Sequence, residues 1–471
     1  MVRWGRYCES ISFCGKAIQV ASHFIFDADT ATINSTIIEG DDSTATVSFC
    51  SNEGLGSLIR GFTITHAATT SGRGIYCTYS SPTIRQNVIT NNRIVDGGGG
   101  AICCNRLASP VIADNEVLAN YAQLGGAIYC LDRSSPSISG NAVRGNSAGA
   151  GGGIYCSDMS SPFIENNAIS GNYAIQIGGG VHCQLGSAPN IINNVIAGDS
   201  AGYYGGGVAC WDVSTATPTI VNNEITGNMA KQAGGGIYCH TASPLIDNNV
   251  LRANFAGYYG AGVLCDLWSS PVIQGNTMIG NRAGNRGGGV SCMSTSRTPI
   301  VRDNIISRSM AGGGIACEDG SNPTIRHNDV WANADGDFHN CPPGVGDTSW
   351  GTNVNGEPCD SFFNVSCPPL FCFPDTGDYH LAENSCCVGA GEGGVDIGAF
   401  GVGCPAYVLG DVNRDGLIDI VDLVDLIGYL YRAAPAPNAL PAGDTNYDGE
   451  VNLADIVCLL NHVFRGGSLP C

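Results

Sequence analysis

Residues 151–174 read GGGIYCSDMSSPFIENNAISGNYA, and variants of this unit follow one another along most of the chain. Aligned on the Gly-rich start, one Cys recurs about every 27 residues, a spacing far below domain size and typical of a solenoid. A Pro, an Asn and an Ile keep the same period, as Pro162, Asn167 and Ile169 do in this copy. The recurring cysteines are Cys77, Cys104, Cys130, Cys156, Cys183, Cys210, Cys239, Cys265, Cys292 and Cys317, and Cys50 fits as an eleventh.

Each unit alternates like a β-strand. Ile154 and Cys156 are two residues apart and therefore share one face of a strand, whereas Tyr155 points to the other face. Short apolar runs broken by Gly, Ser-Pro and Asn predict three short strands per turn. Stacking the turns in register places the Cys column inside as buried free thiols, because parallel rungs hold Cβ atoms too far apart for relaxed disulfides. An inward Asn167 then hydrogen-bonds the Asn above and below it.

These units, together with LIRGFTITHA at residues 58–67, resemble the right-handed parallel β-helix proteins of the pectate-lyase-like superfamily. The resemblance covers about residues 1–340 and implies a mainly β fold, a right-handed three-strand parallel β-helix solenoid. Residues 341–405 break the period, contain seven Cys and resemble the irregular coils that cap such rods, so we expect disulfides there. The fold hosts lyases, hydrolases and adhesins, and the resemblance therefore leaves the activity open.

The composition of the chain favours some classes of binding partner over others. The chain has 471 residues, 67 Gly and a formal net charge of −20, which disfavours nucleic acid and anionic lipid and suits divalent cations. The absence of a long apolar run argues against membrane insertion. The start, MVRWGRYCES, lacks the apolar core of a secretory signal, and strand-like alternation begins at once. We therefore expect a signal and part of a first coil to be missing from the N-terminus.

The outward column beside the Cys positions is a candidate sugar-binding face. It contains Tyr129, Tyr155 and Tyr238, together with Tyr76 and His182. Aromatic rings in a row suit the apolar faces of sugar rings, which predicts carbohydrate binding by Tyr129, Tyr155 and Tyr238. The alternative is that tyrosine simply favours exposed strands.

Catalytic residues are not assigned by the sequence. Glycoside hydrolysis needs two carboxylates, and β-elimination from an acidic sugar needs a base. Asp132, Asp158 and Asp212 each follow the Cys column by two residues, and Arg144 is a candidate partner for them. Repulsion between neighbouring carboxylates and the interruption of the column by Leu185 favour an ordinary solvated surface role for the aspartates. If the protein is an enzyme, we expect a polysaccharide lyase or a glycoside hydrolase.

Two acidic loops lie near the C-terminus, GDVNRDGLIDIVDLVDLIGYLYR from residue 410 and GDTNYDGEVNLADIVCLLNHVFR from residue 443. Oxygen-bearing residues occupy positions 1, 3, 5, 9 and 12 of each loop, and Gly at position 6 permits the turn of a calcium loop. Each loop runs directly into an amphipathic helix. The predicted apolar faces consist of Leu423, Leu426, Ile427 and Leu430 in the first helix and the matching Ile456, Leu459, Leu460 and Val463 in the second. The predicted Ca²⁺ ligands are Asp411, Asn413, Asp415, Asp419 and Asp422 with the Leu417 carbonyl, and Asp444, Asn446, Asp448, Asn452 and Asp455 with the Glu450 carbonyl.

Residues 406–471 resemble a type I dockerin, a calcium-binding α-helical module that plugs into a cohesin domain. The resemblance implies Ca²⁺ as cofactor and a cohesin of a scaffold or surface protein as partner. Positions 10 and 11 of the loops, Ile420-Val421 and Leu453-Ala454, are apolar, which leaves open which cohesin is bound. We expect a secreted or cell-surface carbohydrate-associated protein, with polysaccharide as substrate or ligand. The alternative is a non-catalytic surface or adhesive repeat protein.

Overall fold

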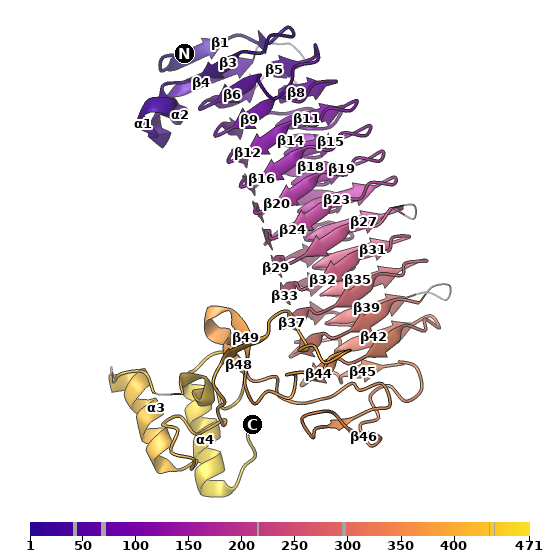
Figure 1. Ribbon diagram of the computed structural model, residues 1–471, viewed down its shortest axis with the longest axis vertical. Coiled ribbons are helices and arrows are strands. Elements are labelled where there is room, and N and C mark those ends of the chain that lie inside the picture. The colour runs from indigo at the N-terminus through magenta and orange to yellow at the C-terminus, as the bar shows by residue number, and fades with distance from the viewer. Residues whose placement is uncertain (41–44, 67–71, 214–215, 294–297, 433, 438) are drawn as a thin grey trace.

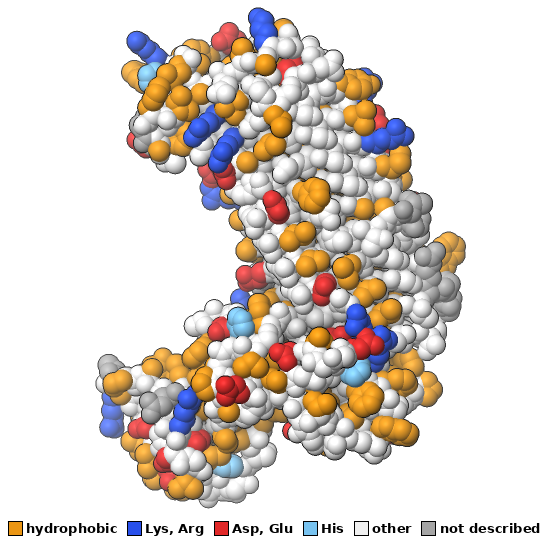
Figure 2. All heavy atoms as spheres, viewed as in Figure 1, with side chains coloured by type: hydrophobic (Ala, Val, Ile, Leu, Met, Phe, Trp, Pro, Cys, Tyr) orange, Lys and Arg blue, Asp and Glu red, His pale blue; other side chains and the backbone are white. Residues whose placement is uncertain are grey.

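A computed structural model describes residues 1–40, 45–66, 72–213, 216–293, 298–432, 434–437 and 439–471. The repeats stack into a long rod, and the two C-terminal helices lie beside its last turns (Figure 1). Near the N-terminus, α1 (Phe24–Asp27) and α2 (Thr30–Ser35) project from the same side of the rod. A hollow therefore separates the two ends (Figure 2). No helix of the described residues is long and apolar enough to cross a bilayer.

Three long parallel sheets form the walls of the rod. Sheet 1 runs from β1 (Gly5–Cys8) to β44 (Asp329–Trp331), and sheet 2 runs from β2 (Ile11–Ser12) to β45 (Phe338–His339). Sheet 3 runs from β3 (Gln19–Ala21) to β43 (Thr324–Arg326). Within the described residues these sheets contain 13, 13 and 12 strands. The predicted mainly β parallel solenoid is confirmed.

The central turns carry a fourth strand that the sequence pattern did not predict. A fourth sheet runs from β14 (Tyr121–Leu124) to β38 (Arg282–Ala283) and holds seven strands among the described residues. Nearly every one of these units contains a second Asn, such as Asn146 and Asn172, and the residues that follow this position remain extended. They pair from turn to turn, as Ala148 does with Ala174. The cross-section of these turns is consequently four-sided.

The Cys column lies inside the rod, as predicted. Ile154 and Cys156 of β19 (Ile154–Cys156) are fully buried, and Cys156 pairs in register with Cys183 of the next rung. The column from Cys77 to Cys317 consists of free thiols. Cys50 does not belong to it: Phe49 pairs with Cys77, and Cys50 is exposed. The larger apolar ring of Phe49 occupies the inward position.

The Asn column forms the predicted ladder. The Nδ2 of Asn141 donates to the Oδ1 of Asn167 at 3.0 Å, and the backbone N of Asn141 donates to the same oxygen at 2.9 Å. A second ladder, which the sequence analysis did not assign, stacks Asn146 on Asn172 in the same way. Asp199 replaces an Asn in this second ladder.

Irregular segments close the end of the rod. They contain β46 (Gly351–Thr352) and β47 (Pro358–Cys359), followed by a sheet of β48 (Phe371–Phe373), β49 (Asp378–Ala382) and β50 (Val402–Cys404). The disulfides Cys367–Cys386 and Cys372–Cys404 confirm the expectation for this region. A third disulfide, Cys458–Cys471, was not expected and lies in the C-terminal module.

The C-terminal module contains α3 (Ile420–Arg432) and α4 (Leu453–Arg465). Leu423 and Leu426 of α3 pack against Ile456 and Leu459 of α4 in a small buried cluster. These four belong to the predicted apolar helix faces. Leu460, also placed on that face, is exposed instead.

Candidate functional site

The first acidic loop folds around its own carboxylates. The Oδ1 of Asp411 accepts from the backbone N of Asp415 at 3.1 Å, and the Oδ2 accepts from the N of Gly416 at 3.0 Å. Asp422, at the start of α3, reaches back and accepts from the N of Val412 and the N of Asp419, both at 2.9 Å. Burial raises the pKa of Asp422. The loop and the helix are thus joined through the last predicted ligand.

The second loop brings its carboxylates closer together. Single oxygens of Asp444, Asp448 and Asp455 lie within 4.8 Å of one another. The Oδ1 of Asp444 is buried and has no hydrogen-bond partner in the described part of the chain. Burial raises the pKa of Asp444 to about 7, although Arg308 opposes the shift. Asn452 accepts from the N of Ala454 at 2.8 Å and caps α4.

This donor set fits calcium. Hard carboxylate and amide oxygens with a backbone carbonyl are the ligands that Ca²⁺ takes, and a buried carboxylate oxygen without a partner needs a cation or a proton. Asp411, Asp415 and Asp422 in the first loop, with Asp444, Asp448 and Asp455 in the second, would hold the ions. A bound cation would neutralise the clustered charges and tie each loop to its helix.

The second loop also packs against the rod. Tyr447, at loop position 4, is only 2% exposed and accepts from the backbone N of Phe371 at 2.7 Å. The guanidinium carbon of Arg308 lies 4.4 Å from the centre of its ring, and the ring of Trp331 lies 5.3 Å away. The equivalent residue of the first loop, Arg414, is exposed. The two loops therefore have different surroundings.

Both helices leave apolar side chains in solvent, opposite their shared core. On each helix these residues recur at helical spacing and form a stripe, which we call the apolar stripe. Exposed apolar patches of this kind mark protein interaction sites. The apolar stripe consists of Ile420, Val421, Val424 and Tyr431 on α3, and Leu453, Val457, Leu460 and Phe464 on α4.

The predicted tyrosine face is wrong in its exposure. Tyr129, Tyr155 and Tyr238 share an outward column, yet only 7%, 2% and 1% of their surfaces are exposed. The Gly-rich turns pack over them: a Cβ on Gly151, whose φ is +64°, would lie 2.6 Å from the Cβ of Tyr155. Glycine is needed at this turn because the tyrosines lie under it. These rings cannot present their faces to a sugar.

A half-buried cluster of Trp211, His240 and Asp266 follows the Cys column by one residue. Asp266 accepts from the hydroxyl of Tyr238 at 2.8 Å and lies 3.2 Å from the Nδ1 of His240. Burial alone would raise the pKa of Asp266, but the hydrogen bonds from His240 and Tyr238 outweigh burial. The pKa of Asp266 therefore lies below its usual value. His240 stacks on Trp211 with ring centres 3.9 Å apart. Trp211, His240 and Asp266 were not predicted as site residues, although each follows the Cys column by one residue and this constant offset was a usable signal.

Arg144 lies on a different sheet from the strands that precede Asp132 and Asp158, which occupy neighbouring turns of the rod. Arg144 lies on sheet 1 and forms an ion pair with Glu116. Asp132 and Asp158 occupy turns that follow strands of sheet 2, with φ near 52°. Their role is therefore compatible with turn formation, which Asp tolerates at positive φ.

A cleft lies where the rod, the cap and the second loop meet. Its larger part has a volume of about 810 Å³ and is lined by Arg252, Arg308, Trp331, Tyr379 and Tyr447, among others. The Nη2 of Arg308 is buried there without a hydrogen-bond partner among the described residues.

A second cavity of about 500 Å³ adjoins the first, since Arg252 and Tyr379 line both. It extends along sheet 1 past Glu224 to Phe400. Burial raises the pKa of Tyr379, and its hydrogen bond with Arg252 opposes the shift. This cleft was not predicted from the sequence, because its lining residues come from distant parts of the chain.

Comparison with protein families gives two matches. Residues 22–196, 125–256 and 206–355 match the model of the right-handed beta helix region, in overlapping segments that together span most of the chain. Residues 409–464 match the type I dockerin domain. No curated protein matches the chain.

Proposed function

Because the chain belongs to the right-handed beta helix family and carries a type I dockerin domain, we propose that it is a secreted protein whose rod holds polysaccharide in the cleft. The dockerin implies a cohesin partner and makes the chain a cohesin-binding module of the cellulosome type. Dockerin modules are typically extracellular or located at the cell surface. The observation that carries the proposal is the pairing of two calcium-type loops with an exposed apolar stripe on the helices that follow them.

Calcium supports this role by ordering the surface that docks. Type I dockerins bind calcium. In this chain Asp422 and Asp455 begin the two helices and accept hydrogen bonds from the loops before them. Neutralising these carboxylates holds both helix starts in place, and with them the N-terminal ends of the apolar stripe.

Polysaccharide binding is supported by the chemistry of the cleft. The half-buried ring of Trp331 provides an apolar face for a sugar ring, whereas the ring of Tyr379 is only 5% exposed and forms part of the wall. Arg252 and Arg308 provide positive charge in an otherwise acidic protein. Guanidinium groups pair with carboxylates in a bidentate geometry, so the cleft favours an acidic saccharide. The adjoining cavity gives length for more than one sugar unit.

The docking proposal is tested with cohesin binding. Asp411→Ala combined with Asp444→Ala should abolish calcium-dependent binding to a cohesin panel while the rod remains folded. Val424→Asp, on the apolar stripe, should weaken binding at least tenfold without affecting calcium uptake. Asp425→Asn, an exposed change on the same helix, is the control. Binding that survives the double change would contradict the proposal.

The cleft proposal is tested with a panel of acidic and neutral polysaccharides, scored for retention and for products. Arg252→Gln should reduce retention of an acidic polysaccharide about tenfold, whereas Arg282→Gln, on the fourth sheet, should not. New reducing ends or unsaturated uronides would identify an enzyme. Equal retention by both variants would exclude the cleft, and no retention at all would favour the adhesive alternative.

A further inference from the structure

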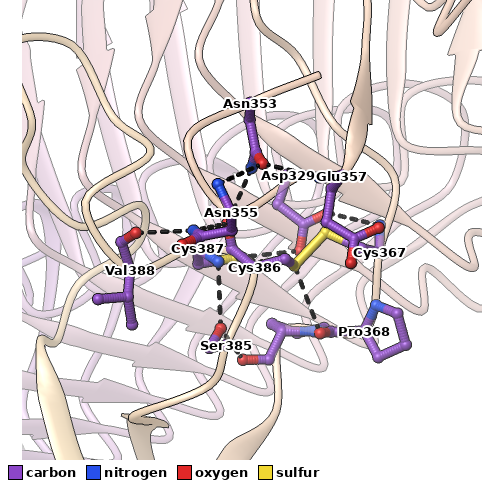
Figure 3. The surroundings of a disulfide bond; sticks show 11 residues. Asp329, Asn353, Asn355, Glu357, Cys367, Pro368, Ser385, Cys386, Cys387 and Val388 are labelled. Atoms are coloured by element: carbon purple, nitrogen blue, oxygen red, sulfur yellow. Dashed lines mark hydrogen bonds between the residues drawn. A yellow bond between two sulfur atoms is a disulfide. The ribbon is translucent and has the colours of Figure 1, made fainter. Parts of the chain in front are cut away.

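A group of sulfur and carboxylate side chains lies inside the cap, away from the cleft and the calcium loops. Figure 3 shows Asp329 together with Cys367, Cys386 and Cys387. All four side chains are buried. Asp329 comes from β44, the last strand of sheet 1, and the three cysteines come from the irregular cap segment.

Three of the distances among these four side chains are already close to those of a tetrahedral metal site. The Sγ of Cys387 lies 3.5 Å from the Oδ2 of Asp329, and the Sγ of Cys367 lies 3.9 Å from its Oδ1. The Sγ atoms of Cys386 and Cys387 are 4.0 Å apart. With Zn–S bonds of about 2.3 Å, the ligands of a tetrahedral zinc ion lie about 3.5–3.8 Å apart. Single ligand atoms of Asp329, Cys367 and Cys386 lie within 4.8 Å of one another. For all four groups to bind one ion, the Cys367–Cys386 disulfide must open and the thiol of Cys387 must move toward the other three.

A structural disulfide alone does not account for this cluster. Asp329 is a fully buried carboxylic acid group whose hydrogen bonds among the described residues come from the backbone N of Cys367, at 3.2 Å, and from the thiol of Cys387, at 3.5 Å. Burying an ionised carboxylate without a cation is costly, and Cys387 adds a buried thiol next to a closed disulfide. Sulfur ligands with one carboxylate select zinc over calcium or magnesium.

The surrounding cap holds these groups in place. The side-chain amides of Asn353 and Asn355 both donate to the carbonyl of Cys386, at 3.0 and 2.9 Å. The backbone N of Cys387 donates to the Oγ of Ser385 at 3.2 Å. Hydrogen bonds from surrounding residues of this kind orient the ligands of a metal site.

We propose that, when two equivalents of a small-molecule thiol reduce the Cys367–Cys386 bond and leave as their disulfide, Asp329, Cys367, Cys386 and Cys387 bind one zinc ion. Binding releases the thiol protons, as thiolate ligands require. A small-molecule disulfide reverses the state: Cys367 and Cys386 thiolates give two electrons, form their S–S bond, and the oxidant leaves as two thiolates while zinc is released. The same residues thus cross-link the cap with or without metal.

The test uses the full chain, reduced with a phosphine in buffer containing calcium and then titrated with Co²⁺ as a spectroscopic probe. We expect sulfur-to-cobalt charge-transfer bands that saturate at one equivalent and disappear when one equivalent of Zn²⁺ is added. Metal analysis should find one zinc per reduced chain and none after oxidised glutathione restores the Cys367–Cys386 bond, as read by mass spectrometry.

Variants separate the site from other thiols. Cys387→Ser leaves the disulfide pair intact and should weaken zinc binding at least tenfold, and Asp329→Asn should also weaken it. Cys359→Ser, another buried cap thiol, should not change the titration. If reduction unfolds the cap, one equivalent of zinc should restore its thermal transition. Absence of charge-transfer bands, equal binding by Cys387→Ser, or failure of zinc to restore the cap would overturn the proposal.

Discussion

The Asn ladders of the rod and the carboxylate loops of the dockerin both bury rows of polar side chains, but they satisfy them differently. In the rod, Asn141 donates to Asn167 and accepts from Asn115, because an amide carries both a donor and an acceptor. In the second calcium loop, Asp444 and Asp455 carry only acceptors when ionised, and one oxygen of Asp444 has no partner among the described residues. An array of amides can therefore stabilise itself, whereas an array of carboxylates needs a cation.

One residue of the rod is an exception, because it places a carboxylate within a row of amides. Asp199 stands in the second ladder, where its Oδ1 accepts from the backbone N and Nδ2 of Asn172 at 2.7 and 2.9 Å. Its Oδ2 is buried without a partner in the part of the chain described. Burial raises the pKa of Asp199 to about 8, so that a proton replaces the missing amide hydrogen. A proton neutralises the buried carboxylate in the rod, whereas calcium is expected to neutralise the carboxylates of the dockerin.

The largest expected effect comes from removing calcium. Chelation should unfold α3 and α4 and leave the β-helix intact, because each loop loses about 4 kcal/mol when free calcium had been a thousandfold above Kd. Circular dichroism should lose its helical part and keep its strand part. Asp455→Asn should weaken calcium binding, and Asp425→Asn is the matched control. Identical helical signals with and without chelator would contradict the expected calcium dependence.

The next effect concerns Asp199 and pH. Its native pKa of about 8 exceeds the unfolded value of about 3.9, so the native chain keeps a proton that the unfolded chain loses between these values. The free energy of unfolding of the rod should therefore fall as pH rises from about 4 to 8, by up to about 1.4 kcal/mol per pH unit. Above pH 8 this contribution should be lost completely.

Asp199→Asn completes the ladder and should remove this dependence while stabilising the rod at alkaline pH. Guanidinium unfolding of the full chain at several pH values, with calcium present, measures both. Asp247→Asn, on sheet 3 and outside the ladders, is the control for general charge effects. If the wild-type slope persists in Asp199→Asn, the ladder explanation is wrong.

The sequence predicted what repeats and missed what depends on contact between unlike segments. Cys183 and Asn167 were placed correctly because a constant period sets equal residues above one another. Cys50 was misplaced because Phe49 takes the inward position. Tyr155 was expected in solvent because its burial depends on a turn from the same unit that folds over it.

The candidate sites likewise differ in how far they could be predicted from the sequence. The ligand positions of the calcium loops could be proposed from spacing, because all of them lie within one short segment. The cleft could not, since Arg308 on the rod, Tyr379 in the cap and Tyr447 in the dockerin meet only through tertiary packing. Asp329 and Cys387 likewise come together only when the cap folds onto the last strand of sheet 1.

The smallest expected effect tests whether the second loop is part of the rod assembly while the first is not. Tyr447→Phe keeps the ring against Arg308 and Trp331 but removes the oxygen that accepts from the backbone N of Phe371 at 2.7 Å. Leaving that buried N–H unpaired should cost about 1–2 kcal/mol. By calorimetry with calcium present, the dockerin transition should shift down by about 4–8 °C per kcal/mol, while the main transition of the rod should not move.

The control is Arg414→Asn, which changes the equivalent position of the first loop to a residue that tolerates the same positive φ. It should change the free energy of unfolding of neither the dockerin nor the rod by more than about 0.5 kcal/mol. Equal shifts in the two variants would mean that the loops do not differ in their attachment to the rod, and the contact through Tyr447 would then have no energetic role.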